Sequence, residues 1–112
     1  MTRSNLHIEL SNGTSLICVA DSSSAPEQGY IVESLIQPLL SLNNSEQELL
    51  LLQEHCTMND RRTNATYRYT INLITKEVRF FEEQYDYGKD RFRRGKDITQ
   101  RYEDYIKTID NN

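Results

Sequence analysis

Residues 91–96 read Arg91-Phe-Arg-Arg-Gly-Lys96 and bring positive charge together with an aromatic ring. Such side chains neutralise carboxylates or phosphates, and the ring can stack on a base or enter a pocket of a protein. Because tyrosine and arginine are enriched at protein interfaces, we predict a partner-binding surface here. Its six residues are Tyr85, Tyr87, Arg91, Phe92, Arg93 and Arg94.

Two other interpretations of this basic segment stay open. In the first, residues 89–96 bind single-stranded nucleic acid, with Tyr87 and Phe92 stacking on bases. The chain as a whole has a formal net charge of −4, so a basic footprint across the domain is missing and we rank this second. In the other, the segment is a solvated loop whose arginines pair with acids just upstream, including Glu82, Glu83 and Asp86.

The two halves of the chain differ in charge. Residues 1–60 contain eight acidic residues and one basic residue, whereas residues 61–112 contain twelve basic and nine acidic residues. Complementary charge steers and orients protein contacts, so the basic segment suits an acidic protein or the acidic half of a second copy. We therefore expect a protein partner of unknown identity, and a homodimer is one form it takes.

Histidine and cysteine are too sparse for a strong catalytic motif. If His7 faces Cys18 across a hairpin, the pair resembles an activated thiolate, but the sequence places no third group to orient the histidine. Adding His55 and Cys56 completes a zinc-like set, although the spacing does not match the usual close pairs. We expect no catalytic residue, metal or cofactor and no enzyme activity, with a small enzyme carrying a pocket between sheet and helices as the remaining alternative.

Two hairpins are predicted. Asn12-Gly13 between apolar runs is typical of a tight turn, and centring the turn there pairs Leu6 with Val19 and Ile8 with Ile17. The second hairpin covers residues 66–85, with Leu73 opposite Val78. Residues 86–96 are expected to be a charged loop, with an extended edge as a variant.

Three helical segments are predicted between and after the hairpins. The first follows a capping pattern at residues 24–27 and ends or bends near Pro38, which lacks an N–H. The second runs over residues 45–55, and its four consecutive leucines cannot share one face. The third begins after Asp97 and carries an apolar stripe at helical spacing: Ile98, Tyr102, Tyr105, Ile106 and Ile109.

These elements predict one compact α+β domain over residues 1–112, in the order ββ-α-α-ββ-α, with an antiparallel sheet of two hairpins and helices on one face. No apolar run approaches the length of a membrane span, and the two cysteines do not suggest a disulfide-rich secreted domain. We expect a small acidic cytoplasmic protein of a regulatory kind (adaptor, inhibitor, immunity-type or chaperone-like) that makes no contact with membranes.

Overall fold

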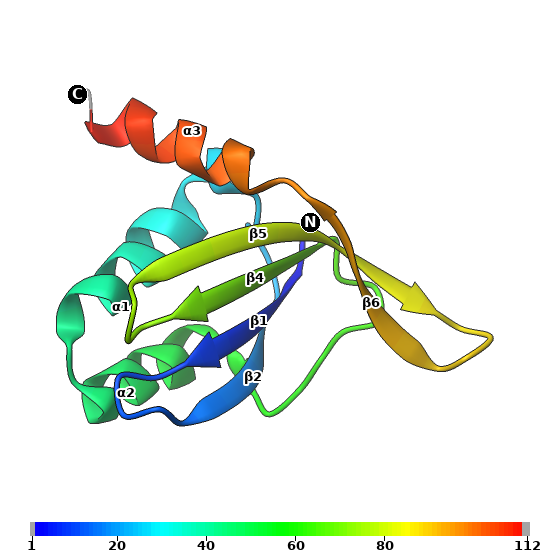
Figure 1. The fold of residues 1–112 in the computed structure, drawn as a ribbon, viewed down its shortest axis with the longest axis horizontal. Helices are drawn as coiled ribbons and strands as arrows, with labels where there is room; N and C mark the ends of the chain where they lie inside the picture. Colours follow the sequence, from blue (N-terminus) through cyan, green and yellow to red (C-terminus); the bar gives the residue numbers. More distant parts are fainter. Residues whose placement is uncertain (1, 111–112) are drawn as a thin grey trace.

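A computed structural model describes residues 2–110 and shows a mixed α+β fold with a six-stranded sheet (Figure 1). The expected order of hairpin, helices, hairpin and helix is matched only in part, because two further strands, β3 and β6, stand before and after the second hairpin. The strands are β1 (Ser4–Glu9), β2 (Ser15–Ala20), β3 (Thr57–Met58), β4 (Tyr67–Asn72), β5 (Glu77–Asp86) and β6 (Arg91–Asp97). The helical segments are a 3₁₀ turn η1 (Pro26–Gln28), a π-helix η2 (Ile31–Ile36), α1 (Gln37–Leu42), α2 (Ser45–His55) and α3 (Thr99–Asp110).

The sheet has the strand order β3-β2-β1-β4-β5-β6, and its central pair, β1 and β4, runs parallel. The prediction of a purely antiparallel sheet of two hairpins was therefore wrong. The two hairpins join through their first strands, which point the same way. This arrangement shields β1 and β4 between neighbours on both sides and leaves the charged β6 at an edge.

The first hairpin is present, but its predicted register was wrong by one residue. Its loop has three residues rather than two: Leu10 N–H bonds to the Thr14 carbonyl at 2.8 Å, and Gly13 has φ of +87°. Leu6 consequently lies opposite Cys18 rather than Val19. A shift of one residue exchanges the faces of β2, because side chains alternate along a strand.

The second hairpin differs from its predicted register by two residues, so its faces are those expected. Ile71, not Leu73, lies opposite Val78, and residues 73–76 form a four-residue loop. Residues 86–96 were predicted as a charged loop with an extended edge as a variant; the variant is the closer of the two, because Arg91–Asp97 forms strand β6 at the edge of the sheet and pairs with the end of β5.

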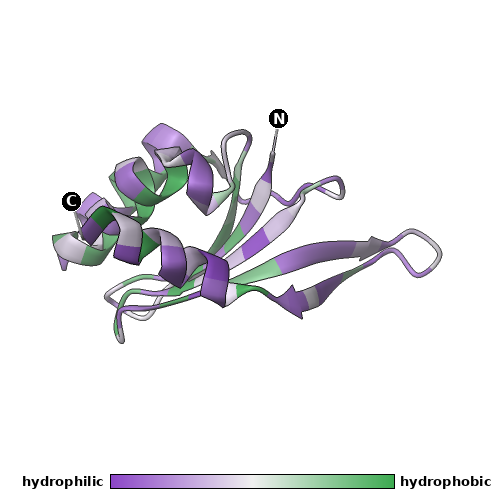
Figure 2. Ribbon diagram, turned by 90° about the horizontal axis from the view of Figure 1, so that it is seen from above, coloured by the Kyte–Doolittle hydropathy of each residue, from purple (hydrophilic) through white to green (hydrophobic). Residues whose placement is uncertain are grey.

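The helices cover one face of the sheet (Figure 2). The winding changes from π to α between Ile36 and Gln37, so Pro38 lies in the first turn of α1, where its missing N–H does least harm. In α2, Leu52 is fully buried and Leu50 is 64% exposed, as expected for leucines that cannot share a face. The stripe of α3 packs on the core as predicted.

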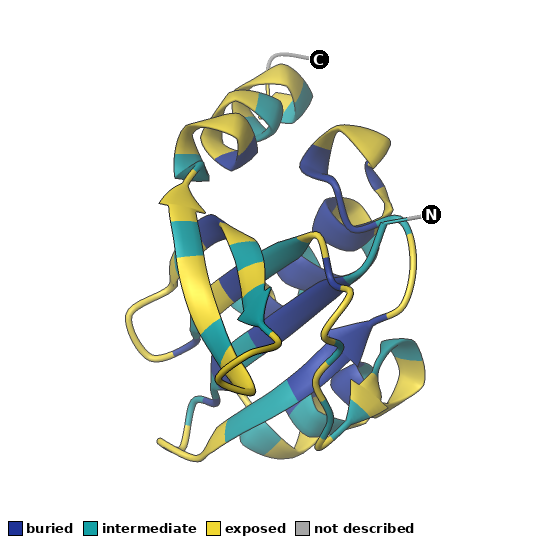
Figure 3. Ribbon diagram, turned by 90° about the vertical axis from the view of Figure 1, so that its right-hand side faces the viewer, coloured by how far each residue is buried: buried dark blue, intermediate teal, exposed yellow. Residues whose placement is uncertain are grey.

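The core lies between the helices and this face of the sheet. Its sheet side includes Leu6, Tyr69 and Phe80, all fully buried, and the Tyr69 hydroxyl donates to the Ser24 carbonyl at 2.7 Å. The other face of the sheet, called the open face below, has no helix on it and is crossed at one end by residues 59–66 (Figure 3).

Candidate partner-binding site

The end of β5 and most of β6 form a two-stranded ribbon that projects from the body of the protein. We call residues 82–96 the arm; it extends at the right of Figure 1 and points toward the viewer in Figure 3. All six residues predicted to bind a partner lie on it or at its tip. Tyr85 pairs with Phe92, while Arg91, Arg93 and Arg94 lie opposite Asp86, Gln84 and Glu83.

An aromatic cluster occupies the face of the arm that continues the open face of the sheet. The ring centroids of Tyr85 and Phe92 are 4.8 Å apart across the two strands, and Tyr87 packs edge-on against Tyr85 at the same distance. Tyr87 is 75% exposed. The cluster therefore combines a fixed cross-strand pair with a large aromatic side chain open to solvent.

Two arginine side chains lie over aromatic rings along this face. The Arg94 guanidinium carbon is 4.6 Å from the ring centroid of Phe81, and that of Arg61, from the loop over the open face, is 5.2 Å from the centroid of Phe92. At these distances the positive charge is attracted by the face of the ring, which restricts where the guanidinium lies.

None of the arm's basic side chains forms an ion pair within the part of the chain that the structure describes. These side chains are Lys89, Arg91, Arg93, Arg94 and Lys96. Elsewhere most arginines are paired with acids: Arg3, Arg62, Arg68, Arg79 and Arg101. The segment is a strand rather than the solvated loop of the alternative interpretation, and its arginines form no ion pair with the upstream acids among the described residues, although Arg91 lies opposite Asp86 and Arg94 opposite Glu83.

The base of the arm is held by a buried polar network. Glu83 accepts a 2.8 Å hydrogen bond from Arg68 Nη2 and another of the same length from Asn5 Nδ2. The carboxylate side chain is 1% exposed and that of Arg68 is 14% exposed. Asn5 also binds the backbone of Arg62 in both directions, so the network ties β1, β4, β5 and the overlying loop together.

A bulge sets the direction of the arm. Between the pairs Phe81–Asp97 and Glu83–Arg94 the register shifts by one residue, so that Gly95 and Lys96 both lie opposite Glu82. A Cβ atom at Gly95 would lie 2.8 Å from the Glu82 carbonyl oxygen. Only glycine fits this close approach without a shift of the backbone.

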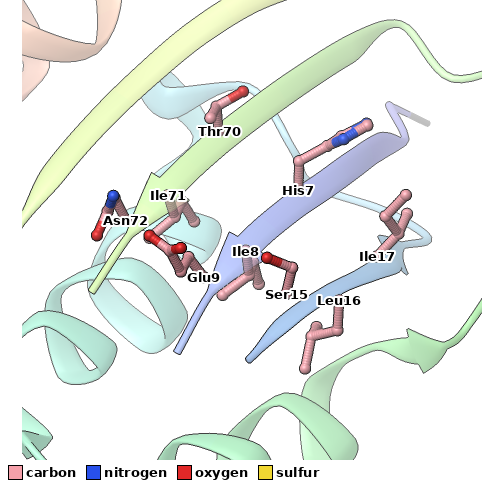
Figure 4. Close-up of a pocket in the computed structure, with 9 residues that line it drawn as sticks. All are labelled: His7, Ile8, Glu9, Ser15, Leu16, Ile17, Thr70, Ile71 and Asn72. Carbon is pink, nitrogen blue, oxygen red and sulfur yellow. The ribbon is translucent and has the colours of Figure 1, made fainter. Parts of the chain in front are cut away.

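The open face contains a shallow depression of about 430 Å³ that the sequence did not suggest (Figure 4). Polar side chains around Ile17 line it, including His7, Glu9 and Thr70. Burial, reinforced by the nearby charges of Arg68 and Arg61, lowers the pKa of His7 to about 4. His7 is therefore neutral near pH 7, and its buried Nε2 has no hydrogen-bond partner within the described residues.

The expected pairing of His7 with Cys18 was wrong. His7 lies opposite Ile17 on the open face, whereas Cys18 points into the core, a consequence of the one-residue change in register. Cys18 instead interacts with Cys56, and this contact together with burial raises the pKa of the Cys18 thiol. Within residues 2–110 no cluster of three or more histidine, cysteine or acidic side chains could hold a metal ion.

No family model, curated protein or solved structure matches this chain. Within the described residues, every helix is too short or too polar to cross a membrane.

Proposed function

We propose that this chain is a small, non-enzymatic, cytoplasmic protein-binding module, of an adaptor, inhibitor, immunity or chaperone kind, and that the arm is its contact surface. The observation that carries the proposal is the position of the arm's side chains. Tyr85, Tyr87 and Phe92 form one cluster on a ribbon that projects away from the core, and the arginines around it have no ion-pair partner among the described residues.

Aromatic and arginine side chains are enriched among the residues that dominate interface energetics, and aromatic rings bury a large area at a low cost in side-chain entropy. On the arm, the cross-strand pair of Tyr85 and Phe92 and the stacking of Arg61 already restrict these side chains before a partner binds. Pre-ordering of this kind reduces the entropy lost on association. The depression lies on the same face of the sheet as the aromatic cluster, but it is lined by residues of β1, β2 and β4 and by none of the arm.

The test compares two tyrosine variants. Tyr87→Ala removes the exposed ring of the arm, and Tyr30→Ala removes a ring that is 45% exposed on the opposite, helical side. Proteins captured from an extract of the source cells by the wild-type chain are purified and titrated against each variant. We expect Tyr87→Ala to weaken binding by about tenfold or more, as is typical of a central aromatic contact, and Tyr30→Ala to leave it unchanged. If alanine at Tyr87, Arg91 and Phe92 leaves every recovered partner bound with wild-type affinity, the proposal is wrong.

A further inference from the structure

Strand β6 forms one edge of the sheet, so half of its backbone N–H and C=O groups point away from β5 with no strand beyond them. Such an edge is a template for another extended segment. The opposite edge is less accessible because β3, although only two residues long, covers the end of β2. The arm therefore offers the longer free strand edge of the domain.

Basic side chains flank this edge on both faces of the arm. Alternation along β6 puts Arg91 and Arg93 on one face and Phe92 and Arg94 on the other, and the cross-strand partners follow the same division. Within the described residues no acid forms an ion pair with these arginines, although Asp86 lies opposite Arg91 and Glu83 opposite Arg94, so both faces of the edge present guanidinium groups that are not engaged in an ion pair.

This charge pattern selects among the strands that could be added. A second β6 would bring arginine beside arginine, and like charges in cross-strand positions are destabilising. A strand with acidic residues would gain carboxylate–guanidinium pairs on both faces, with the planar geometry that favours two hydrogen bonds to one carboxylate. The positive edge thus prevents self-addition and attracts an acidic strand.

The bulge limits where such a strand can pair. Gly95 and Lys96 share one position opposite Glu82, which bends β6 and interrupts a regular ladder there. The regular part runs from Arg91 to Arg94, about 13 Å at the usual rise per residue. A short extended segment with two or three carboxylates fits this length.

A polyanionic nucleic acid fits the arm less well. Besides the buried and paired Glu83, three acids lie within the arm itself and would repel a continuous run of phosphates: Glu82, Asp86 and Asp90. The net charge of −4 adds to this repulsion at low salt. A peptide segment avoids it, because its charges occur only at chosen positions and its backbone can bond to the free edge.

We propose that the arm binds an extended acidic segment of a partner protein, which adds to β6 as a seventh strand with its carboxylates on the arginines. This rests on the proposed function, because it names the chemistry of the partner at the same surface. Main-chain hydrogen bonds to residues 91–94 position the added strand along β6, and Arg91, Arg93 and Arg94 favour a strand that contains acidic residues.

The test uses the full chain and three fluorescein-labelled peptides of about eight residues, a common strand length. One alternates valine and glutamate, the second has glutamine for glutamate, and the third is the glutamate peptide N-methylated at alternate residues. Fluorescence anisotropy is measured at about 25 mM and about 200 mM salt, where screening differs strongly. We expect the glutamate peptide to bind at low salt, and the other two at least about tenfold more weakly.

The matched protein variants are Arg91→Glu/Arg93→Glu and Lys76→Glu/Lys107→Glu, which change the net charge equally while the second pair lies outside the arm. We expect about a tenfold or greater loss of peptide affinity in the first variant only, as found when charges at a contact are reversed. Amide shifts in the NMR spectrum should be largest at residues 91–94.

Several results would overturn the inference. Equal binding of the N-methylated peptide would exclude strand addition, and equal losses in the two double variants would reduce the effect to net charge. Tighter binding of a single-stranded oligothymidylate than of the glutamate peptide would favour nucleic acid. A salt-sensitive dimer in light scattering, lost in Arg91→Glu/Arg93→Glu, would make a second copy the occupant. If the glutamate peptide does not bind but Tyr87→Ala still loses a captured partner, only the acidic-strand proposal is wrong. If the glutamate peptide binds as expected but Tyr87→Ala keeps every captured partner, the proposed function is wrong.

Discussion

Replacing Glu83 by glutamine removes the charge of a carboxylate buried beneath the arm while keeping its shape. The glutamine oxygen can still accept the hydrogen bond from Asn5, so the interaction lost is the ion pair with Arg68. That guanidinium is 14% exposed and has no other acid within reach among the described residues. Breaking a buried ion pair from one side leaves an uncompensated charge and costs roughly 3–5 kcal/mol.

Water reaches part of Arg68, so the lower end, about 3 kcal/mol, is the expected loss for Glu83→Gln. At about 4 °C per kcal/mol for a domain of this size, the thermal midpoint should fall by about 12 °C. Circular dichroism melts and urea titrations at pH 7 measure both quantities. The double variant Arg68→Met/Glu83→Gln removes both charges, and we expect it to recover much of the loss.

The matched control is Glu77→Gln, which breaks an ion pair of the same chemistry on the same strand. Glu77 and Arg79 have side chains that are 59% and 52% exposed, so solvent screens their attraction. We expect no measurable change in the midpoint. Equal losses for Glu83→Gln and Glu77→Gln, or additive losses in the double variant, would show that burial of the pair at the base of the arm is not what gives it strength.

Three further predictions concern pH, the bulge and the thiols. His7 has a folded-state pKa of about 4 against an ordinary value of 6.5, so its contribution to stability is complete above pH 6.5 and is lost as the pH falls from 6.5 toward 4. His7→Gln should flatten the urea midpoint across that range; an unchanged slope would contradict the burial of the imidazole. Gly95→Ala should loosen the arm, because the new Cβ would lie 2.8 Å from a main-chain carbonyl oxygen of β5. We expect faster hydrogen exchange of the β6 amides in this variant. The control is Gly88→Ala, where the nearest contact of the new Cβ is a side-chain oxygen at 3.3 Å and the exchange should rise far less. In the folded protein, iodoacetamide should label the half-buried Cys56. Cys18 is fully buried and has a raised thiol pKa, so it should react only after unfolding. Equal labelling of the two cysteines, measured by mass spectrometry of peptides, would contradict this packing.

Local patterns predicted the elements better than the way they pair. Asn12-Gly13 identified a hairpin, and the stripe of α3 identified a helix, because turn chemistry and periodicity are local properties. The register of the first hairpin depends on whether its loop has two or three residues, and both kinds of loop accept this dipeptide. The error of one residue therefore reversed the predicted faces of Ile17 and Val19.

The parallel pairing of β1 with β4 could not be read from spacing, because it depends on which edges of two separate hairpins meet. Strand β6 was missed for a different reason. Its sequence is charged and contains Gly95, which reads as a loop, and it becomes a strand only because Glu82–Asp86 extends β5 beyond the core and offers it a partner. The six candidate residues were chosen on composition alone; the structure brings them together on the arm, and their role in binding stays a prediction.

The two ends of β5 have different surroundings, since the first half contributes to the core and the second half forms part of the arm. Its first half carries Phe80 into the core under α3, where burial of an aromatic ring stabilises the fold. Among the described residues no helix covers its second half. There the Tyr85 ring contacts the rings of Tyr87 and Phe92, which both belong to the arm. The Arg68–Glu83 pair lies at the boundary between these halves. The buried ion pair fixes the base of the arm, while the rest of the arm stays exposed. Such an arrangement would let the side chains of the arm be positioned for a partner without contributing to the core.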